Sequence, residues 1–265
     1  MKDHPKGPKV PVAKHDDYWS LARQPLPCLL FLLPLLATYE IGAGVLAVQD
    51  SARNGADYWL RSGLHLAGFK HPWLLPVVVV GMLVAWQIAG GYRWKASPGT
   101  LIGMLAESAL FGGCLVLLGQ LQDAVFHAHA GQLAEGPHQA IPLAQAGSLP
   151  LVITYLGAGV YEETLFRLCL IPATFVVLRL LLVPRGAAML LSVLATSVLF
   201  SLAHYAGPSA DQFTWFSFVF RASAGLFFAI LFVVRGFGVT VGSHAAYDVI
   251  VGVLIPAFVA SHGAV

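Results

Sequence analysis

Apolar residues gather in long continuous runs along this chain, and polar residues lie mainly between the runs. The runs cover residues 26–48, 73–90, 101–121, 149–183, 187–205, 213–234 and 239–260. Because a helix needs roughly 20 mostly apolar residues to cross a membrane, the runs predict seven transmembrane spans. The run 149–183 is too long for one crossing, and a division at Pro172 would give eight spans. The pattern therefore predicts an all-α, polytopic transmembrane helix bundle.

The composition is that of a membrane protein rather than a soluble one. Hydrophobic residues make up 57% of the chain and charged residues 11%, and the mean hydropathy is +0.74. Soluble domains average about 45–50% apolar and 25% charged residues. The 15 basic and 13 acidic residues are too few and too scattered for a nucleic-acid surface, so no nucleic-acid partner is expected. Cys28, Cys114 and Cys169 stand alone within apolar runs, which indicates small core residues.

The polarity pattern divides the chain into two regions. Residues 1–25 form a polar, basic N-terminal segment, and residues 26–265 form one transmembrane helical domain whose part 149–260 carries the motifs described below. With a cytoplasmic N-terminus and seven spans, ten lysines and arginines lie in cytoplasmic segments and three in the opposite loops. This asymmetry follows the positive-inside rule. Segment 122–148 holds no lysine or arginine, so we expect it on the opposite side of the membrane.

Ionisable side chains interrupt the last apolar runs. They are Glu162, Glu163, Arg167, His204, His244 and Asp248. A charged side chain at the middle of a bilayer costs roughly 2.5–3.5 kcal/mol on insertion scales. Such groups must face one another or a water-filled cavity, so we expect all of them to line one site.

Helical spacing assigns different roles to the two adjacent glutamates. Residues four apart share a helix face, which pairs Glu163 with Arg167 and His244 with Asp248. Glu162 lies about 100° around the helix from Glu163, so one glutamate alone can meet Arg167 squarely. We assign Glu163 to an ion pair with Arg167 and Glu162 to the chemistry.

Other charged residues of the apolar runs have no legible partner in the sequence. They are Glu40, Glu107 and Arg221, which we interpret as interface or cavity-lining residues.

The depth of His244 is a difficulty for a joint site, because straight helical hairpins place it far from Glu162. An extended stretch from Gly236 to Gly242 would remove the difficulty. Extended backbone rises about 3.3 Å per residue, whereas a helix rises about 1.5 Å.

The motifs resemble those of the CPBP family, the intramembrane proteases that include the CAAX prenyl endopeptidases and the bacterial Abi proteins. That family has a Glu-Glu-x-x-x-Arg motif, a later Phe-x-x-x-His motif and a final His-x-x-x-Asn motif. Glu162, Glu163 and Arg167 match the first, Phe200 and His204 the second, and His244 with Asp248 the third. Asp248 stands where asparagine is common, and Leu168 stands where glycine often follows the arginine.

The resemblance implies an intramembrane endopeptidase that uses an activated water. Glu162 would act as the base, His204 would orient the water, and His244 with Asp248 would bind the oxyanion. This mechanism requires no cofactor. The alternative is a divalent metal such as zinc, held by His204 and His244 together with Glu163 or Asp248. The chain lacks the stronger zinc signature His-Glu-x-x-His.

The resemblance also implies partners and a location. Family members are associated with prenylated C-termini, with peptide maturation and bacteriocin immunity, and with C-terminal membrane anchors. We therefore expect a membrane protein, or a lipidated or C-terminally anchored peptide, as substrate in the lipid bilayer. The expected location is the bacterial cytoplasmic membrane. The rival hypotheses are an ion-coupled transporter and a non-catalytic immunity or scaffold protein.

Overall fold

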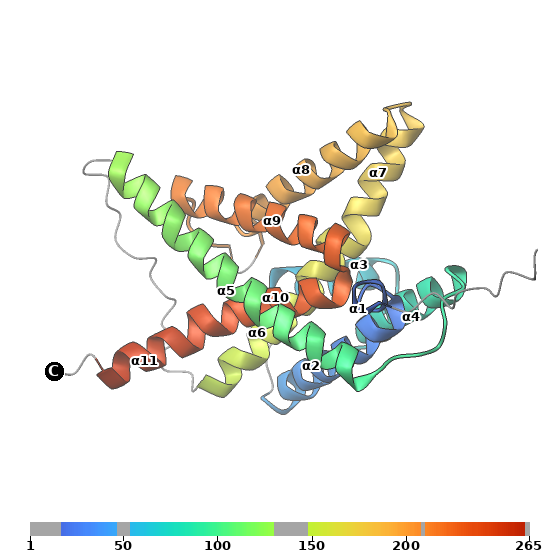
Figure 1. Ribbon diagram of the computed structural model, residues 1–265, viewed down its shortest axis with the longest axis horizontal. Helices are drawn as coiled ribbons and strands as arrows, with labels where there is room; N and C mark the ends of the chain where they lie inside the picture. The colour runs from blue at the N-terminus through green and yellow to red at the C-terminus, as the bar shows by residue number, and fades with distance from the viewer. Residues whose placement is uncertain (1–16, 47–53, 130–147, 208–209, 263–265) are drawn as a thin grey trace, which may run out of the picture.

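A computed structural model describes residues 17–46, 54–129, 148–207 and 210–262, and all regular elements within these ranges are helical (Figure 1). In chain order the elements are α1 (Tyr18–Leu21), α2 (Pro25–Val45), α3 (Gly55–Leu66), α4 (Leu74–Ala89), α5 (Pro98–His129), α6 (Ser148–Glu163), the π-helix η3 (Thr164–Leu170), α7 (Ile171–Leu180), α8 (Arg185–Ala203), α9 (Trp215–Arg235), α10 (Phe237–Val249), the π-helix η4 (Ile250–Leu254) and α11 (Ile255–His262). The predicted all-α class is confirmed.

Five of the described helices are long and apolar enough to cross a membrane. They are Pro25–Val45, Pro98–Phe126, Arg185–Ala203, Trp215–Arg235 and the continuous helix Phe237–His262. Leu74–Ala89 is apolar but shorter. The chain is thus a multi-pass membrane protein, but the predicted count of seven or eight spans is not confirmed. The run 149–183 divides into α6, η3 and α7, with Pro172 in the first turn of α7.

The segment expected as a loop over residues 122–148 is partly helical. Helix α5 continues to His129, so the first residues of this segment extend the helix instead of leaving it. The rest of the segment up to residue 147 lies outside the described residues. The predicted orientation in the membrane stays a prediction.

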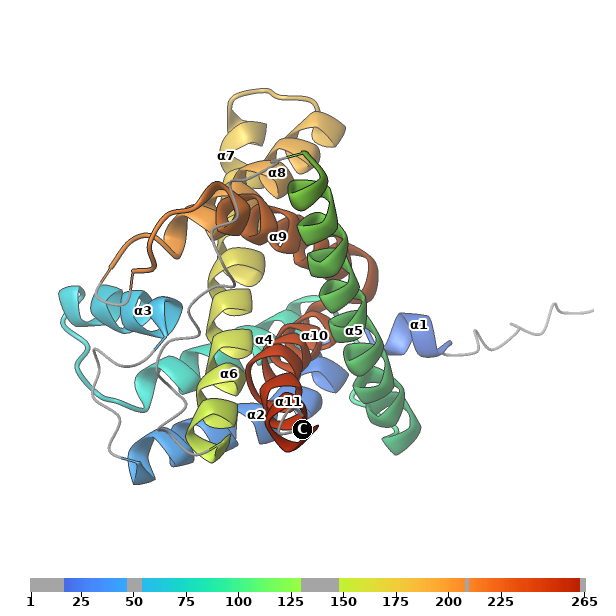
Figure 2. The same ribbon diagram turned by 90° about the vertical axis from the view of Figure 1, so that its left-hand side faces the viewer.

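Helix α10 occupies the centre of the bundle. It packs against α2, α5, α6 and α9, and both views show it enclosed by these helices (Figures 1 and 2). Every residue from Phe237 to Ala245 is buried. The expected extended stretch from Gly236 to Gly242 is therefore wrong, because the backbone satisfies its hydrogen bonds as a helix in this apolar surrounding.

A single glycine makes the turn between α9 and α10. Gly236 has a φ of +89°, in the region that residues with a Cβ rarely adopt. Helix α9 ends at Arg235 and α10 begins at Phe237, so the chain reverses without a loop. This sharp turn brings His244 into the bundle at a depth that a simple hairpin count does not give.

Close contact between α6 and α10 depends on Gly159. A Cβ at this position would lie 3.0 Å from both the amide nitrogen of Ala245 and the carbonyl oxygen of Val241. Real Cβ contacts are seldom this short, so a larger residue would push the helices apart. Gly159 lies one turn before Glu163, and His244 directly precedes Ala245, so this contact sets the spacing between two motifs.

Glu107, which we interpreted as an interface or cavity-lining residue, has a partner that the sequence did not reveal. Its carboxylate binds Arg235 of α9, with Nη2 at 2.7 Å and Nε at 3.0 Å from Oε2. Arg235 is one of the ten basic residues that we had counted in cytoplasmic segments, but its side chain is buried. Its guanidinium lies 3.9 Å from the centre of the Trp19 ring. The pair joins α5 to the turn that starts α10, a contact across 128 positions that helical spacing cannot predict.

Glu40 also has partners, one from the region between the first two apolar runs and one from α6. Arg61 of α3 bonds Asp57 at 2.6 Å and Glu40 at 2.8 Å, and the hydroxyl of Tyr161 donates to the same carboxylate oxygen of Glu40. Tyr39 donates to Asp57 at 2.7 Å. This buried network attaches α3 to α2 and α6, beside the motif that begins at Glu162.

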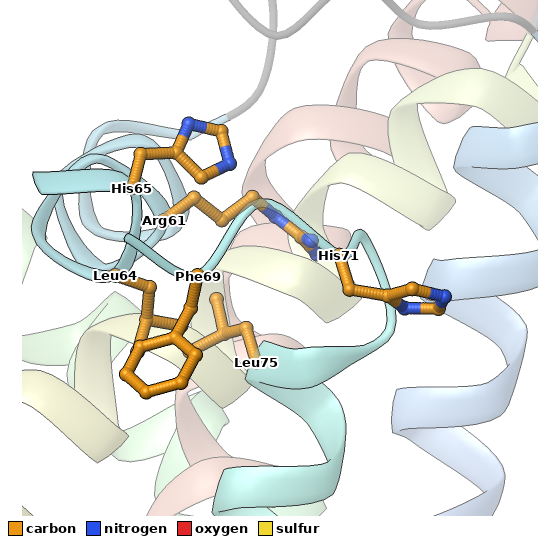
Figure 3. A pocket seen from close by; sticks show the side chains of 6 residues that line it. All are labelled: Arg61, Leu64, His65, Phe69, His71 and Leu75. Carbon is orange, nitrogen blue, oxygen red and sulfur yellow. The ribbon is translucent and has the colours of Figure 1, made fainter. Parts of the chain in front are cut away.

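A small pocket that includes Arg61 lies between α3, the segment that follows it and the first turn of α4 (Figure 3). It is lined by Arg61, Leu64, His65, Phe69, His71 and Leu75. The residues of the three motifs take no part in its lining.

Arg221 also has a partner that the sequence did not reveal. Its guanidinium forms an ion pair with Asp211, in the segment between α8 and α9.

We expect Glu107→Gln to destabilise the protein, because it leaves Arg235 charged and buried. Removal of one partner from a buried ion pair typically costs about 3–5 kcal/mol. The melting temperature in detergent should fall well below those of the wild type and of the control Asp17→Asn, which changes an exposed carboxylate. Replacement of both partners, Glu107→Leu with Arg235→Met, should recover most of the loss. A wild-type melting temperature for Glu107→Gln would contradict the structural role of the pair.

Candidate active site

The structure brings all the sequence-predicted site residues together from three parts of the chain. The first part is the end of α6, which holds Glu162 and Glu163, together with Arg167 in η3. The second is the C-terminus of α8, where His204 is the C-cap residue. The third is α10, which holds His244 and Asp248. Oε2 of Glu162 lies 3.8 Å from Nε2 of His204 and 3.8 Å from Nε2 of His244. The motifs therefore meet in space, although more than 30 residues separate each from the next.

The predicted ion pair between Glu163 and Arg167 is confirmed. Nε of Arg167 lies 3.0 Å from Oε2 of Glu163, and both side chains are almost fully buried. The guanidinium also donates from Nη2 to the carbonyl oxygen of Gly225 at 3.0 Å and lies 4.6 Å from the centre of the Phe200 ring. Arg167 thus joins η3 to α8 and α9 as well as neutralising Glu163.

Glu163 has a second contact that sequence reasoning missed. Its Oε1 lies 2.7 Å from Nδ1 of His244 on α10. Glu163 therefore contacts both Arg167, one turn further along the same chain segment, and His244 on α10. Helical spacing reveals contacts four residues apart but not contacts between helices, so this bridge could not be predicted from the sequence.

Aromatic contacts fix the ring of His244. The ring of Phe228 on α9 stacks on it at 4.6 Å with an interplanar angle of 15°. The edge of Phe200 approaches it at 5.9 Å. With Nδ1 held by Glu163 and one face covered, the ring presents its Nε2 toward Glu162 and Asp248.

Asp248 lies near His244 but makes a looser contact than Glu163. Its Oδ2 is 3.5 Å from Nε2 of His244, longer than a good hydrogen bond. The expected pairing along the helix is present as an electrostatic contact. The carboxylate adds negative charge where the family pattern commonly has a neutral amide.

The hydrogen bond of His204 defines which ring nitrogen carries hydrogen. Nδ1 lies 2.8 Å from the carbonyl oxygen of Phe200, which can only accept. In the neutral ring Nδ1 therefore donates, and Nε2 keeps its lone pair. This nitrogen is the one that faces Glu162.

Glu162 differs from Glu163 in its surroundings. Its Oε2 is buried, and no donor among the described residues lies within hydrogen-bond range of it. The side chain is 12% exposed, whereas that of Glu163 is fully buried. A carboxylate oxygen placed between two imidazoles in this way can accept a hydrogen bond from a reactant.

The geometry argues against one of the expected metal-ligand sets. Glu163 binds the Nδ1 side of His244, on the opposite edge of the ring from Nε2. One ion therefore could not contact Glu163 together with Nε2 of both histidines. Across the described ranges, no group of three or more histidine, cysteine, aspartate or glutamate side chains is arranged to hold a metal ion.

Each of the two π-helical segments follows a motif. Segment η3 starts at Thr164, directly after the paired glutamates, and η4 starts at Ile250, two residues after Asp248. π-helical turns in α-helices are frequent at functional sites, where the wider turn re-aims side chains. Arg167, inside η3, reaches both Glu163 and Gly225.

Comparison with known protein families gives one match over this region. Residues 144–250 match the family described as type II CAAX prenyl endopeptidase Rce1-like. The matched segment contains all three motifs and confirms the family resemblance that they carry. No curated protein and no solved structure matches the chain.

We expect Arg167→Met to destabilise the protein, because it leaves the buried carboxylate of Glu163 without its main counter-charge. The loss should be about 3–5 kcal/mol, as for other broken buried pairs. Thermal unfolding in detergent measures it, with Arg185→Met, an exposed arginine at the start of α8, as the matched control. Equal melting temperatures for the two variants would show that Arg167 does not hold the site together.

Proposed function

We propose that this chain, with its Rce1-like segment 144–250, is an intramembrane endopeptidase that hydrolyses a peptide bond with a glutamate-activated water. The family match implies a peptidase. The observation that carries the mechanism is the position of Glu162, whose buried Oε2 lies 3.8 Å from Nε2 of both His204 and His244. Separations of this size are spanned by one bridging water.

The first step of the proposed reaction uses Glu162 and His204. A water donates one hydrogen to Glu162 and one to Nε2 of His204, which is the acceptor nitrogen of the neutral ring. Glu162 takes the proton as the water oxygen attacks the carbonyl carbon of the substrate. A new carbon–oxygen bond forms, and the carbonyl oxygen becomes an oxyanion.

His244 is suited to stabilise this oxyanion. Glu163 accepts from Nδ1, and Asp248 lies 3.5 Å from Nε2, so negative charge on both sides compensates a proton on each nitrogen. The Nε2 hydrogen can then bond the oxyanion, and preorganised donors of this kind contribute strongly to catalysis. Collapse of the intermediate breaks the carbon–nitrogen bond, and protonated Glu162 returns its proton to the leaving amine.

The substrate we propose is a polypeptide that reaches the site from the membrane. A membrane protein or a lipidated or C-terminally anchored peptide fits a site on helices of a multi-pass bundle. We place the N-terminus on the cytoplasmic side because of the charge asymmetry of the loops. The bacterial cytoplasmic membrane is the location that the family resemblance implies.

We expect Glu162→Gln to remove activity without unfolding the protein. Glutamine keeps the size of the side chain but cannot accept the proton, so turnover should fall by about 10²–10⁴-fold. An uncut polypeptide should accumulate in membranes and be captured with this variant, and its melting temperature should stay near that of the wild type. Asp17→Asn, which changes an exposed carboxylate outside the motifs, is the control.

Other outcomes of the same experiment separate the rival functions. An ion-coupled carrier would lose transport in Glu162→Gln, and no uncut polypeptide would accumulate. A scaffold or immunity protein would keep its function in the variant. Wild-type cleavage by Glu162→Gln would rule out Glu162 as the base.

Removal of metal tests the alternative mechanism. With a glutamate-activated water, purified protein should keep its peptidase activity after dialysis against EDTA and 1,10-phenanthroline. Activity that is lost on dialysis and restored by added zinc would contradict the proposal. Metal analysis of the purified protein provides the independent control.

A further inference from the structure

One face of α9 borders the site, and it extends beyond the residues already described. Gly225 accepts from Arg167, and Phe228 stacks on His244. Arg221 precedes Gly225 by four residues, so it lies on the same face, about 6 Å further along the helix axis. Ser217, another four residues earlier, bonds the hydroxyl of Tyr205 at 2.6 Å.

The contacts of Arg221 place it beside His204. Its guanidinium lies 5.2 Å from the ring of Tyr205, the residue directly after His204. The backbone amide of Asp211, its ion-pair partner, donates to the carbonyl oxygen of His204 at 2.9 Å. Arg221 is also close enough to interact electrostatically with the His204 ring and with Tyr247, which precedes Asp248.

The guanidinium of Arg221 has unused bonding capacity. Nη2 binds the carboxylate of Asp211, whereas Nη1 is buried and has no hydrogen-bond partner among the residues that the structure describes. The Asp211 side chain is 40% exposed and that of Arg221 is 22% exposed. Ion pairs that reach solvent contribute little to stability, so another carboxylate can replace Asp211 at small cost.

We propose that Arg221 is a specificity residue that binds a carboxylate of the substrate on one side of the scissile bond. Arginine binds carboxylates through two parallel hydrogen bonds, and Arg221 has one such donor unpaired and a second held by an exchangeable partner. The carboxylate would be either the free C-terminus of a short segment beyond the cleaved bond or an acidic side chain. This inference rests on the proposed peptidase function for its meaning, but binding can be measured without cleavage.

Three lipid-anchored probes distinguish the sources of the carboxylate. They are hexapeptides of one apolar sequence with an N-terminal palmitoyl group and a fluorophore. The first ends in a carboxylate, the second in an amide, and the third ends in an amide and carries one internal glutamate. Binding is measured to Glu162→Gln protein in nanodiscs, which prevents turnover, and cleavage is measured with the wild type.

The proposal predicts that one carboxylate peptide binds about 10–100-fold more tightly than the fully amidated peptide, the range that one hydrogen bond to a charged group gives. Preference for the first peptide identifies a C-terminal carboxylate, and preference for the third identifies an acidic side chain. Arg221→Met, made in the Glu162→Gln background, should bring the ratio close to one. Asp211→Asn should raise binding of the preferred peptide.

A charge-swapped variant, Asp211→Arg with Arg221→Asp, separates recognition from a structural role. If Arg221 serves only to form an ion pair with Asp211, the swapped pair should keep the wild-type preference for a carboxylate peptide. This result would overturn the proposal. Under the proposal the preference is lost in the swapped protein. Equal binding, or no binding, of the three peptides to Glu162→Gln protein would also overturn it.

This experiment tests the peptidase function separately from the role of Arg221. Cleavage of the amidated peptide by the wild type, with equal binding of all three, keeps the peptidase and removes the role of Arg221. A carboxylate preference in binding, without cleavage of any peptide, keeps the anion site and removes the peptidase.

Discussion

The site depends on the carboxylate of Glu163, which is shared between two partners in the middle of an apolar bundle. Arg167 compensates its charge at 3.0 Å, and its other oxygen binds Nδ1 of His244 at 2.7 Å. A buried charge is tolerated when it is paired and hydrogen-bonded, and the cost of separating it then fixes its partners in place. This bridge joins two helices and turns Nε2 of His244 toward Glu162, which leaves Glu162 available for chemistry.

The bridge requires α10 to lie deep in the bundle, and three local features allow this. Gly236 reverses the chain within one residue, the pair of Arg235 and Glu107 anchors that turn to α5, and Gly159 lets α6 approach the α10 backbone. Without such close contact His244 could not reach Glu163. The geometry of the candidate site therefore depends on residues that belong to none of the three motifs.

The features that could be predicted from the sequence are those that depend on the spacing of residues along one helix. The all-α membrane class, the pair of Glu163 with Arg167 and the grouping of the motifs follow from apolar runs and four-residue spacing. Contacts between distant helices were not predictable in this way. The partners of Glu40 and Glu107 and the bridge to His244 were missed, and the turn at Gly236 was misread as an extended stretch because glycines permit both.

In the proposed mechanism Glu162 and His204 act together on one water. A double-mutant cycle on turnover measures whether they do. Residues that act as a unit give strongly non-additive losses, because removal of either one already abolishes the shared step. Turnover of one peptide would be measured for the wild type, Glu162→Gln, His204→Asn and the double variant. We expect the double variant to be about as slow as the slower single variant. A loss equal to the product of the two single losses would show that the residues act independently and would rule out a shared water.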